Sequence, residues 1–522
     1  MKYARIATWC AAMIAVVLTV SAVSSTPAST RTWTGLRAQG QAIVDQYGHN
    51  VLLRGFGPGE WTNTEAYMIR WPDQDPGAGR HQSQYGYTAI HNTLTGIMGQ
   101  RAANQYWYTW QAADVTEADI ARMQAWGANS LRLSINYHWL SPSDGVYLAS
   151  GWQWIDQVIA WCKAHNIRVI LCLHAAPGAQ SNYLMADTPD IIAHLWTQPE
   201  RYQPWAIHLW QAIAQRYVNE PYVAGYDLLD EPIPPAGRQR DVRPFYVNVT
   251  RAIRTFDPNH MIFVEGLNFA GDPGGMQAML PPWDNNMVLV FHKYWDSNDQ
   301  ASIQGYLRIR NQYNVPLWNG ETGENTALWL RNMAKLLTAN NIGWNSWTYK
   351  KLDDVGSSAY SISHPPDYDA ILKYVRCLTP TSTDCRPPSQ EQADTIMLQL
   401  AKNAATANCT YESAVITALF GDVSSFALSV NPISATVRNG FSTGYGLSIE
   451  PFGFRGIVRL SVNGLPAGAT ASFTPSSVRT SGTSVLQIST RAGSTAGIYA
   501  LTITGTSSTS KRNVTVPLVI QR

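Results

Sequence analysis

The sequence predicts an α/β fold, a (β/α)8 TIM barrel, followed by a small all-β sandwich. Three observations lead to this prediction. From about residue 40 to residue 377, eight short apolar or β-branched runs alternate with longer amphipathic helical patterns. From Ser425 to Arg522, short alternating runs are separated by turns rich in Gly, Pro and Ser. With 522 residues, the chain can hold a barrel of about 250 residues or more together with further domains.

The eight strand-like runs follow one another with helical patterns between them. In one such helix, TEADIARMQAWG, an apolar face holds Ile120, Met123 and Trp126, and Gly127 marks the end. An open doubly wound sheet is the alternative, but no G-x-G-x-x-G follows the first run, and eight repeats favour closure. The runs are NVLLRGFGPG (50–59), NSLRLSINY (129–137), IRVILCLHAAPG (167–178), YVAGYDLLDEP (222–232), HMIFVEGLN (260–268), NMVLVFHKYW (286–295), VPLWNGETG (315–323) and IGWNSWTYK (342–350).

The chain is expected to divide into four parts. Residues 1–25 have a basic start, an apolar run and small residues at its end, which predicts a cleaved signal peptide and a secreted protein; a membrane anchor is the alternative. The predicted catalytic domain spans 33–377, with a long loop over 60–112 that borders the cleft. A linker with a helical segment follows over 378–423, and the sandwich spans 424–522.

Composition excludes several classes of protein. A net charge of +2 does not indicate the basic surface that a nucleic-acid-binding protein needs. No C-x-x-C spacing is present and the histidines are scattered, so we expect no metal and no cofactor. A disulfide is expected among Cys377, Cys385 and Cys409, whereas Cys162 and Cys172 are expected to be buried thiols. The sandwich has no Trp, His, Cys or Asp, so catalysis is not expected there.

Candidate site residues stand at the carboxyl ends of the predicted strands, where a barrel of this type places its chemistry. The fourth run ends in a pair of acids and the seventh carries a single acid, so carboxylates face each other across the barrel mouth. The candidates are Arg132, His174, Asp230, Glu231, His292, Tyr294, Glu321 and Trp347.

Two carboxylates that flank one bond are the arrangement for glycoside hydrolysis. One must be protonated to help the leaving oxygen depart, and the other must be ionised to attack the anomeric carbon. Arg132 and Tyr294 could hold Glu321 ionised, while His174 and Trp347 would position the sugar.

The chain from about 40 to 377 resembles glycoside hydrolase family 5, the cellulase family of retaining (β/α)8 enzymes. The matching pieces are VLLRGFGPGEW, GANSLRLSINY, LHAAPGAQS, YDLLDEP, FHKYW, WNGETGE and GWNSWTYKK. The resemblance implies Glu231 as acid/base and Glu321 as nucleophile. It implies Arg132, His174, His292, Tyr294 and Trp347 as subsite or supporting residues. The C-terminal sandwich resembles the immunoglobulin-like modules of secreted bacterial enzymes.

Asp230 departs from the family pattern, which has Asn before the acid/base. The Asn amide donates to the sugar 2-hydroxyl, whereas an ionised Asp only accepts. A second carboxylate beside Glu231 also raises the pKa of Glu231. Asp230 either accepts a hydrogen bond from the 2-hydroxyl or marks a different substrate; a salt bridge that points away from the sugar is the structural alternative.

The leading expectation is a secreted, monomeric, retaining enzyme that cleaves a β-1,4-glucan. Its partner would be a polysaccharide or oligosaccharide, with no membrane after signal cleavage. Mannan, xylan, β-1,3-glucan cleaved from the end, or a short glucoside are alternatives on the same barrel. A catalytically weakened carbohydrate-binding protein is a second class. A serine hydrolase is not favoured, because no G-x-S-x-G is present.

Overall fold

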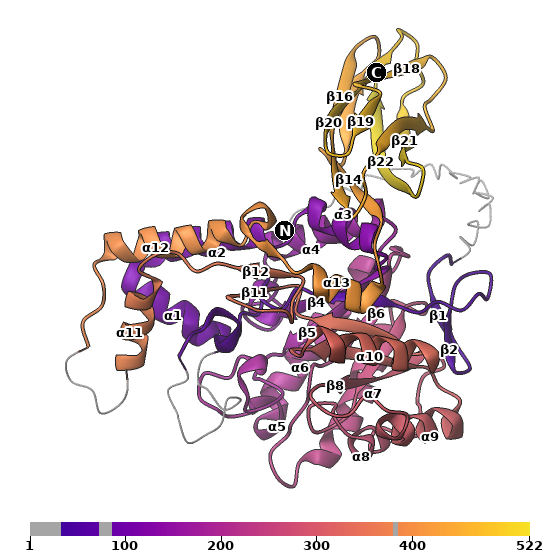
Figure 1. The fold of residues 1–522 in the computed structure, drawn as a ribbon. Coiled ribbons are helices and arrows are strands. Elements are labelled where there is room, and N and C mark those ends of the chain that lie inside the picture. The colour runs from indigo at the N-terminus through magenta and orange to yellow at the C-terminus, as the bar shows by residue number, and fades with distance from the viewer. Residues whose placement is uncertain (1–32, 73–85, 379–384) are drawn as a thin grey trace, which may run out of the picture. The chain divides into compact units, whose positions relative to one another are not determined.

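Eight parallel strands close into a barrel in the order β10-β3-β4-β5-β6-β7-β8-β9, as the sequence predicted (Figure 1). The computed structural model describes residues 33–72, 86–378 and 385–522, so the expected signal peptide lies outside the described residues. The barrel strands are β3 (Arg54–Gly57), β4 (Ser130–Asn136), β5 (Arg168–Ala175), β6 (Val223–Asp227), β7 (Met261–Glu265), β8 (Met287–Lys293), β9 (Leu317–Gly323) and β10 (Gly343–Trp347).

The barrel strands are buried on both faces, as helices outside a parallel sheet require. In β4 and in β6 to β10 every residue is buried. The lower interior is apolar and includes Ile170, Met261, Phe263, Val288 and Trp318. These side chains fill the barrel, so its chemistry must lie at the end of the strands.

Helices follow the strands and cover the outside. In α3 (Glu117–Trp126), Thr116 and Asp119 form a capping box, and Gly127 ends the helix in the left-handed region, with φ of 103°. The other helices of the described segments are α1 (Tyr87–Met98), α2 (Gln100–Asp114), α4 (Ala149–Ala164), α5 (His194–Thr197), α6 (Pro199–Tyr217), α7 (Val242–Arg254), α8 (Pro273–Gln277), α9 (Gln304–Tyr313), α10 (Ala327–Ala339), α11 (Tyr368–Cys377), α12 (Gln390–Asn403) and α13 (Ser413–Phe420), with 3-10 turns at η1 (Ala66–Ile69), η2 (Tyr137–Trp139), η3 (Leu184–Ala186), η4 (Gln239–Asp241), η5 (Ala301–Ile303) and η6 (Thr406–Asn408).

The region 60–112, expected as a long loop, is instead largely helical where it is described, with η1, α1 and most of α2. Tyr106, Trp107 and Trp110 of α2 are buried in a cluster that also holds residues of α1, α11 and α12. The richness in aromatic residues therefore reflects a packed helical face. Among the described residues of this region, those that line the cavity are Glu65 and Tyr67, near its start.

The segment after the barrel packs back onto it. α12 begins with a capping box at Ser389 and lies alongside α2 (Figure 1), and α13 packs against α10. A disulfide joins Cys377 to Cys385, one of the pairings left open by the sequence. Cys162 and Cys172 are buried free thiols, as expected.

The C-terminal region contains two β-sheets around an aliphatic core, which confirms the all-β prediction. One sheet has the order β14-β16-β20-β18 and the other β15-β22-β21-β17-β19. Their strands are β14 (Ser425–Asn431), β15 (Ala435–Arg438), β16 (Ser442–Phe452), β17 (Ile457–Asn463), β18 (Ala469–Thr474), β19 (Ser477–Arg479), β20 (Gly482–Thr490), β21 (Gly497–Thr506) and β22 (Lys511–Gln521).

Short strands complete the described structure: a hairpin of β1 (Arg37–Gln39) and β2 (Ala42–Val44), and a sheet of β11 (Lys350–Leu352), β12 (Tyr360–Ile362) and β13 (Thr410–Tyr411). Within the described ranges, no helix is both long and apolar enough to cross a membrane.

Candidate active site

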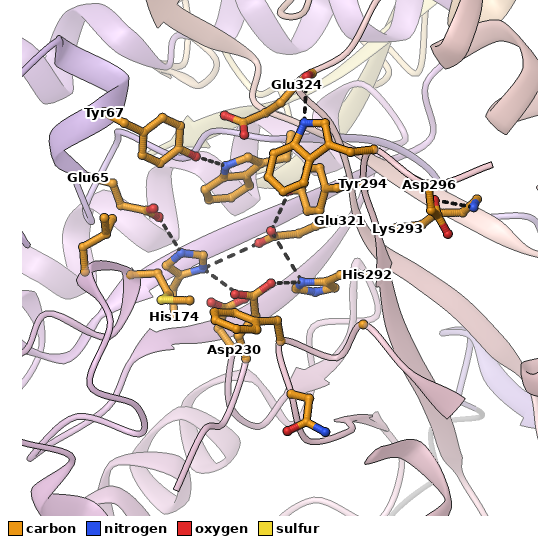
Figure 2. A pocket seen from close by; sticks show the side chains of 18 of the residues that line it. Glu65, Tyr67, His174, Asp230, His292, Lys293, Tyr294, Asp296, Glu321 and Glu324 are labelled. Atoms are coloured by element: carbon orange, nitrogen blue, oxygen red, sulfur yellow. Dashed lines mark hydrogen bonds and ion pairs between the residues drawn. The ribbon is translucent and has the colours of Figure 1, made fainter. Parts of the chain in front are cut away.

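The predicted site residues meet at the carboxyl ends of the barrel strands. A cavity of about 830 Å³ lies there, and Figure 2 shows the side chains around it. Arg132 is fully buried and is not part of the cavity lining, so it acts on the other site residues and does not face the cavity. The remaining predicted residues all line the cavity: His174, Asp230, Glu231, His292, Tyr294, Glu321 and Trp347.

Arg132 of β4 binds four carboxylates at once. Its Nε donates to Asp227 (2.9 Å) and its Nη1 donates to Glu321 Oε1 (2.5 Å). Its Nη2 donates to Asp230 Oδ1 (2.7 Å) and to Glu265 Oε1 (2.9 Å). A guanidinium suits this role because its donors point in fixed, planar directions. Arg132 therefore sets the relative positions of the acids at the barrel mouth.

Glu321 of β9 accepts a hydrogen bond at each oxygen. Arg132 donates to Oε1, and the Tyr294 hydroxyl donates to Oε2 at 2.8 Å. Donors at both oxygens favour the ionised carboxylate. Burial raises the pKa of Glu321, and His292 and Arg132 act in the opposite direction. The contacts expected for Arg132 and Tyr294 are thus present.

Glu231 lies four residues beyond the last residue of β6, in the turn after the strand. Its backbone has a φ of 38°, a region that non-glycine residues adopt rarely. Its Oε1 lies 2.7 Å from His292 Nδ1. Burial raises the pKa of Glu231; His292 opposes this increase, and the neighbouring Asp230 carboxylate adds to it. The environment therefore favours a protonated Glu231, as a general acid requires.

Asp230 forms the salt bridge that was the structural alternative from the sequence, and it still lines the cavity. Its Oδ1 accepts from Arg132, and His174 Nδ1 lies 3.4 Å away. Its Oδ2 is buried and accepts no hydrogen bond within the described structure, although the residue lines the cavity. Burial opposes ionisation, but His174 and Arg132 outweigh it and lower the pKa of Asp230. Asp230 is thus a salt-bridged anion with one oxygen left for another donor.

His174 and Trp347 lie face to face at the cavity wall. Their ring centroids are 5.0 Å apart with planes 12° from parallel. His174 Nε2 lies 3.1 Å from Glu65, and Trp347 Nε1 donates to the Tyr67 hydroxyl at 3.1 Å. Burial lowers the pKa of His174 to about 4, so it is neutral near pH 7.

Several cavity or supporting residues were not found from the sequence. Glu265 ends the strand run MIFVE, the same signal that marked its neighbours, and this signal alone could have found it. Glu65 and Tyr67 come from the segment expected as a loop, and no pattern marks them. Trp295 follows β8 and is 59% exposed at the cavity wall, and Glu324 follows β9.

Three overlapping groups of side chains here have the composition of cation sites. They are Cys172–His174–Asp230, Asp230–Glu265–His292 and Glu231–His292–Glu321. The second and third use carboxylate oxygens that already contact Arg132 or His292. A cation there would compete with these groups for the same oxygens, so the arrangement suits proton transfer better.

Comparison with known proteins identifies a family and several relatives of this chain. Residues 86–353 match the family model described as cellulase (glycosyl hydrolase family 5). The chain is 28% identical over 353 residues to the beta-xylosidase of Phanerodontia chrysosporium, covering 61% of this chain and 71% of that protein. It is 25% identical over 245 residues to the probable glucan 1,3-beta-glucosidase A of Aspergillus niger, covering 47% of this chain and 56% of the relative. Among solved structures, an endogalactoceramidase is 17% identical, with a TM-score of 0.48 over 87% of this chain and 99% of that one.

Proposed function

The chain belongs to glycosyl hydrolase family 5, and from this premise we propose that it cleaves β-glycosidic bonds with retention of configuration. The placement of Glu231 and Glu321 supports the proposal, since an oxygen of each lies within 4.8 Å of the other, with His292 in the same group. Carboxyl groups are about 5–5.5 Å apart in retaining glycosidases and about 6.5–9.5 Å apart in inverting ones, which hold a water between them.

In the first step a carboxylate oxygen of Glu321 attacks the anomeric carbon. The bond from that carbon to the leaving oxygen breaks, its electron pair stays on the oxygen, and Glu231 gives that oxygen its proton. In the second step Glu231, now a carboxylate, takes a proton from water, and the water oxygen displaces Glu321. The product keeps its configuration and both residues return to their starting forms.

The contacts of each carboxylate support this assignment of roles. Glu321 receives donors from Arg132 and Tyr294, which stabilise the anion that attacks. The side chain of Glu231 contacts His292. Burial raises the pKa of both carboxylates, so the two donors to Glu321 are what distinguish the roles. His174, Trp347 and Asp230 line the cavity and would hold the sugar.

We propose a β-1,4-glucan as the first substrate to test. Two relatives are a beta-xylosidase and a probable glucan 1,3-beta-glucosidase, so β-xylosides and β-1,3-glucans are the next substrates to test. The proposal for the whole chain includes export through residues 1–25, a monomeric enzyme and an immunoglobulin-like C-terminal module, with a catalytic domain over 33–377.

A panel of β-1,4-glucan, mannan, xylan and β-1,3-glucan, with product sizing, tests the activity. Proton NMR of the first product tests the stereochemistry, and an inverted first anomer would overturn the retaining assignment. Binding to the panel without cleavage would favour the catalytically weakened binding protein.

A further inference from the structure

A third glutamate, Glu265, stands behind the two proposed catalytic carboxylates. It is the last residue of β7 and is fully buried. Its Oε1 accepts from Arg132 Nη2 at 2.9 Å and lies 3.1 Å from His292 Nε2. Its Oε2 accepts the backbone N–H of Glu231 at 2.7 Å. Glu265 is absent from the cavity lining, so these contacts are its means of acting on the reaction.

The contact with Glu231 holds an unfavourable backbone. A glutamate with a φ of 38° is strained, and such residues persist only where their surroundings hold them. The Glu265 carboxylate accepts the N–H of that residue, which lies four positions beyond Asp227, the last residue of β6. It therefore fixes where the Glu231 side chain leaves the turn.

Glu265 also acts on the side chain of Glu231, through His292. His292 Nδ1 lies 2.7 Å from Glu231 and its Nε2 lies 3.1 Å from Glu265. The partner of one ring nitrogen determines which tautomer the other nitrogen presents. The pKa values of Glu265 and His292 are both raised, so the pair holds a proton between Glu265 Oε1 and His292 Nε2. Whichever of the two carries that proton, the Nδ1–H of His292 is left to donate to Glu231. Glu265 thus controls both the backbone and the side-chain partner of Glu231.

We propose that Glu265 is a positioning residue for the acid/base step, holding Glu231 in place through its N–H and setting the proton that His292 presents to it. This inference rests on the proposed role of Glu231. The ionisable groups around Glu265 are Arg132, Cys172, Asp227, Asp230, Glu231, Tyr246 and His292. Burial raises the pKa of Glu265 to about 8; His292 opposes this increase and Asp227 and Asp230 add to it, which is consistent with a proton held there.

Two variants separate the position of this group from its charge. Glu265→Asp keeps the carboxylate but is one methylene too short to reach the Glu231 N–H. Glu265→Gln keeps the reach, accepts from the Glu231 N–H through its oxygen and donates to His292 Nε2 through its amide, but that amide cannot accept from Arg132 Nη2 as Oε1 does. The matched control is Asp114→Asn, another buried acid, which lies outside the site and whose pKa burial raises to about 6.

The readout is the dependence of kcat/KM on the leaving group. The substrates are phenyl and 2,4-dinitrophenyl β-cellobiosides, β-glucosides and β-xylosides. A phenyl group needs a proton to leave and a dinitrophenyl group does not. Glu265→Asp should lower kcat/KM for the phenyl glycosides by about 10- to 100-fold and for the dinitrophenyl glycosides by less than about threefold. Glu265→Gln should recover part of this loss, because it keeps the contacts with Glu231 and His292 but not the one with Arg132. Asp114→Asn should leave the ratio of the phenyl to the dinitrophenyl kcat/KM unchanged.

The proposal would be overturned if Glu265→Asp lowered kcat/KM equally for the phenyl and dinitrophenyl glycosides, or left kcat/KM for the phenyl glycosides unchanged. Glu231→Ala separates this failure from a failure of the proposed function. If the wild-type enzyme cleaves none of these glycosides, or if Glu231→Ala shows no leaving-group dependence, the proposed function itself is wrong. If Glu231→Ala shows that dependence and Glu265→Asp does not, only the role of Glu265 is wrong.

Discussion

The two ends of the barrel interior use the same strands for opposite purposes. On β7, Met261 and Phe263 fill the lower interior, and Glu265 follows two positions later at the top. On β8, Val288 and Val290 are followed by His292 in the same alternation. All are buried, so burial alone does not distinguish a stabilising end from a chemical one. The difference lies in whether the buried side chain is apolar or needs a charged partner.

Only the polar, upper end of the barrel interior costs free energy of folding. Burying apolar surface stabilises the fold, whereas burying carboxylates costs free energy unless they are paired. Arg132 and His292 supply that pairing for the acids at the top. The upper end therefore has perturbed pKa values but stabilises the fold less. Variants at the upper end should lose activity, and variants at the lower end should lose stability.

The largest effect is expected from Glu321→Gln. An amide cannot attack the anomeric carbon, so kcat should fall by at least about 10⁴-fold. Circular dichroism and substrate binding should be retained, because the variant keeps the size of the side chain. Activity within about tenfold of wild type would show that another group is the nucleophile.

The opposite behaviour is expected from Met261→Ala in the lower interior. Removal of a fully buried methionine side chain should lower the free energy of unfolding by about 2–5 kcal/mol. Urea unfolding measures this loss. The kcat of the folded enzyme should stay close to wild type, and a kcat loss as large as that of an upper-end variant would remove the distinction between the two ends.

The pH dependence of stability is a third way to test the comparison. The pKa of Glu265 is about 8 in the folded protein against an ordinary value of 4.5. Between these two pH values, the folded state therefore binds more protons than the unfolded state. Stability from this group is present at low pH and is lost as pH rises from about 4.5 to about 8. The raised pKa of His292 acts in the same direction.

Urea unfolding at about pH 5 and about pH 8 measures this slope. Glu265→Gln should flatten it, because the amide does not titrate. A wild-type slope that the variant leaves unchanged would show that other groups carry the protons.

The smallest effect is expected from Asp230→Asn. The Asp230 anion raises the pKa of Glu231, so its removal should move the high-pH limb of the kcat/KM profile to lower pH. Turnover should rise if the sugar 2-hydroxyl prefers a donor, as the family pattern implies. A profile and a turnover number identical to wild type would contradict both roles for Asp230.

The sequence predicted the strands and their polar ends well, because a buried parallel strand is a continuous apolar run whose end is visible. His174, His292 and Glu321 lie within the strands, and Asp230 and Glu231 lie just beyond the last residue of β6. Their roles stay predictions from the geometry. The shared contacts of Arg132 were not predictable, since they depend on how four separate strands or turns converge.

Residues from outside the strand pattern were also not predictable. Glu65 and Tyr67 reach the cavity from the segment before α1. The helices that follow this segment are rich in aromatic residues, so their apolar faces do not stand out in the sequence. Glu265 ends its strand as plainly as its neighbours do. The reaction expected from the sequence uses two carboxylates, so it gives no reason to select a third carboxylate.

The packing of α12 against α2 also sets an order of events during synthesis. Helix α2 leaves the ribosome almost three hundred residues before the helix that covers it, since α12 begins at Gln390 and α2 at Gln100. Until then the face of Tyr106, Trp107 and Trp110 lacks part of its cover. A chain cut after Cys377 would keep all eight barrel strands and still expose that face. The segment that resembles a linker therefore completes the folding of a region far earlier in the chain.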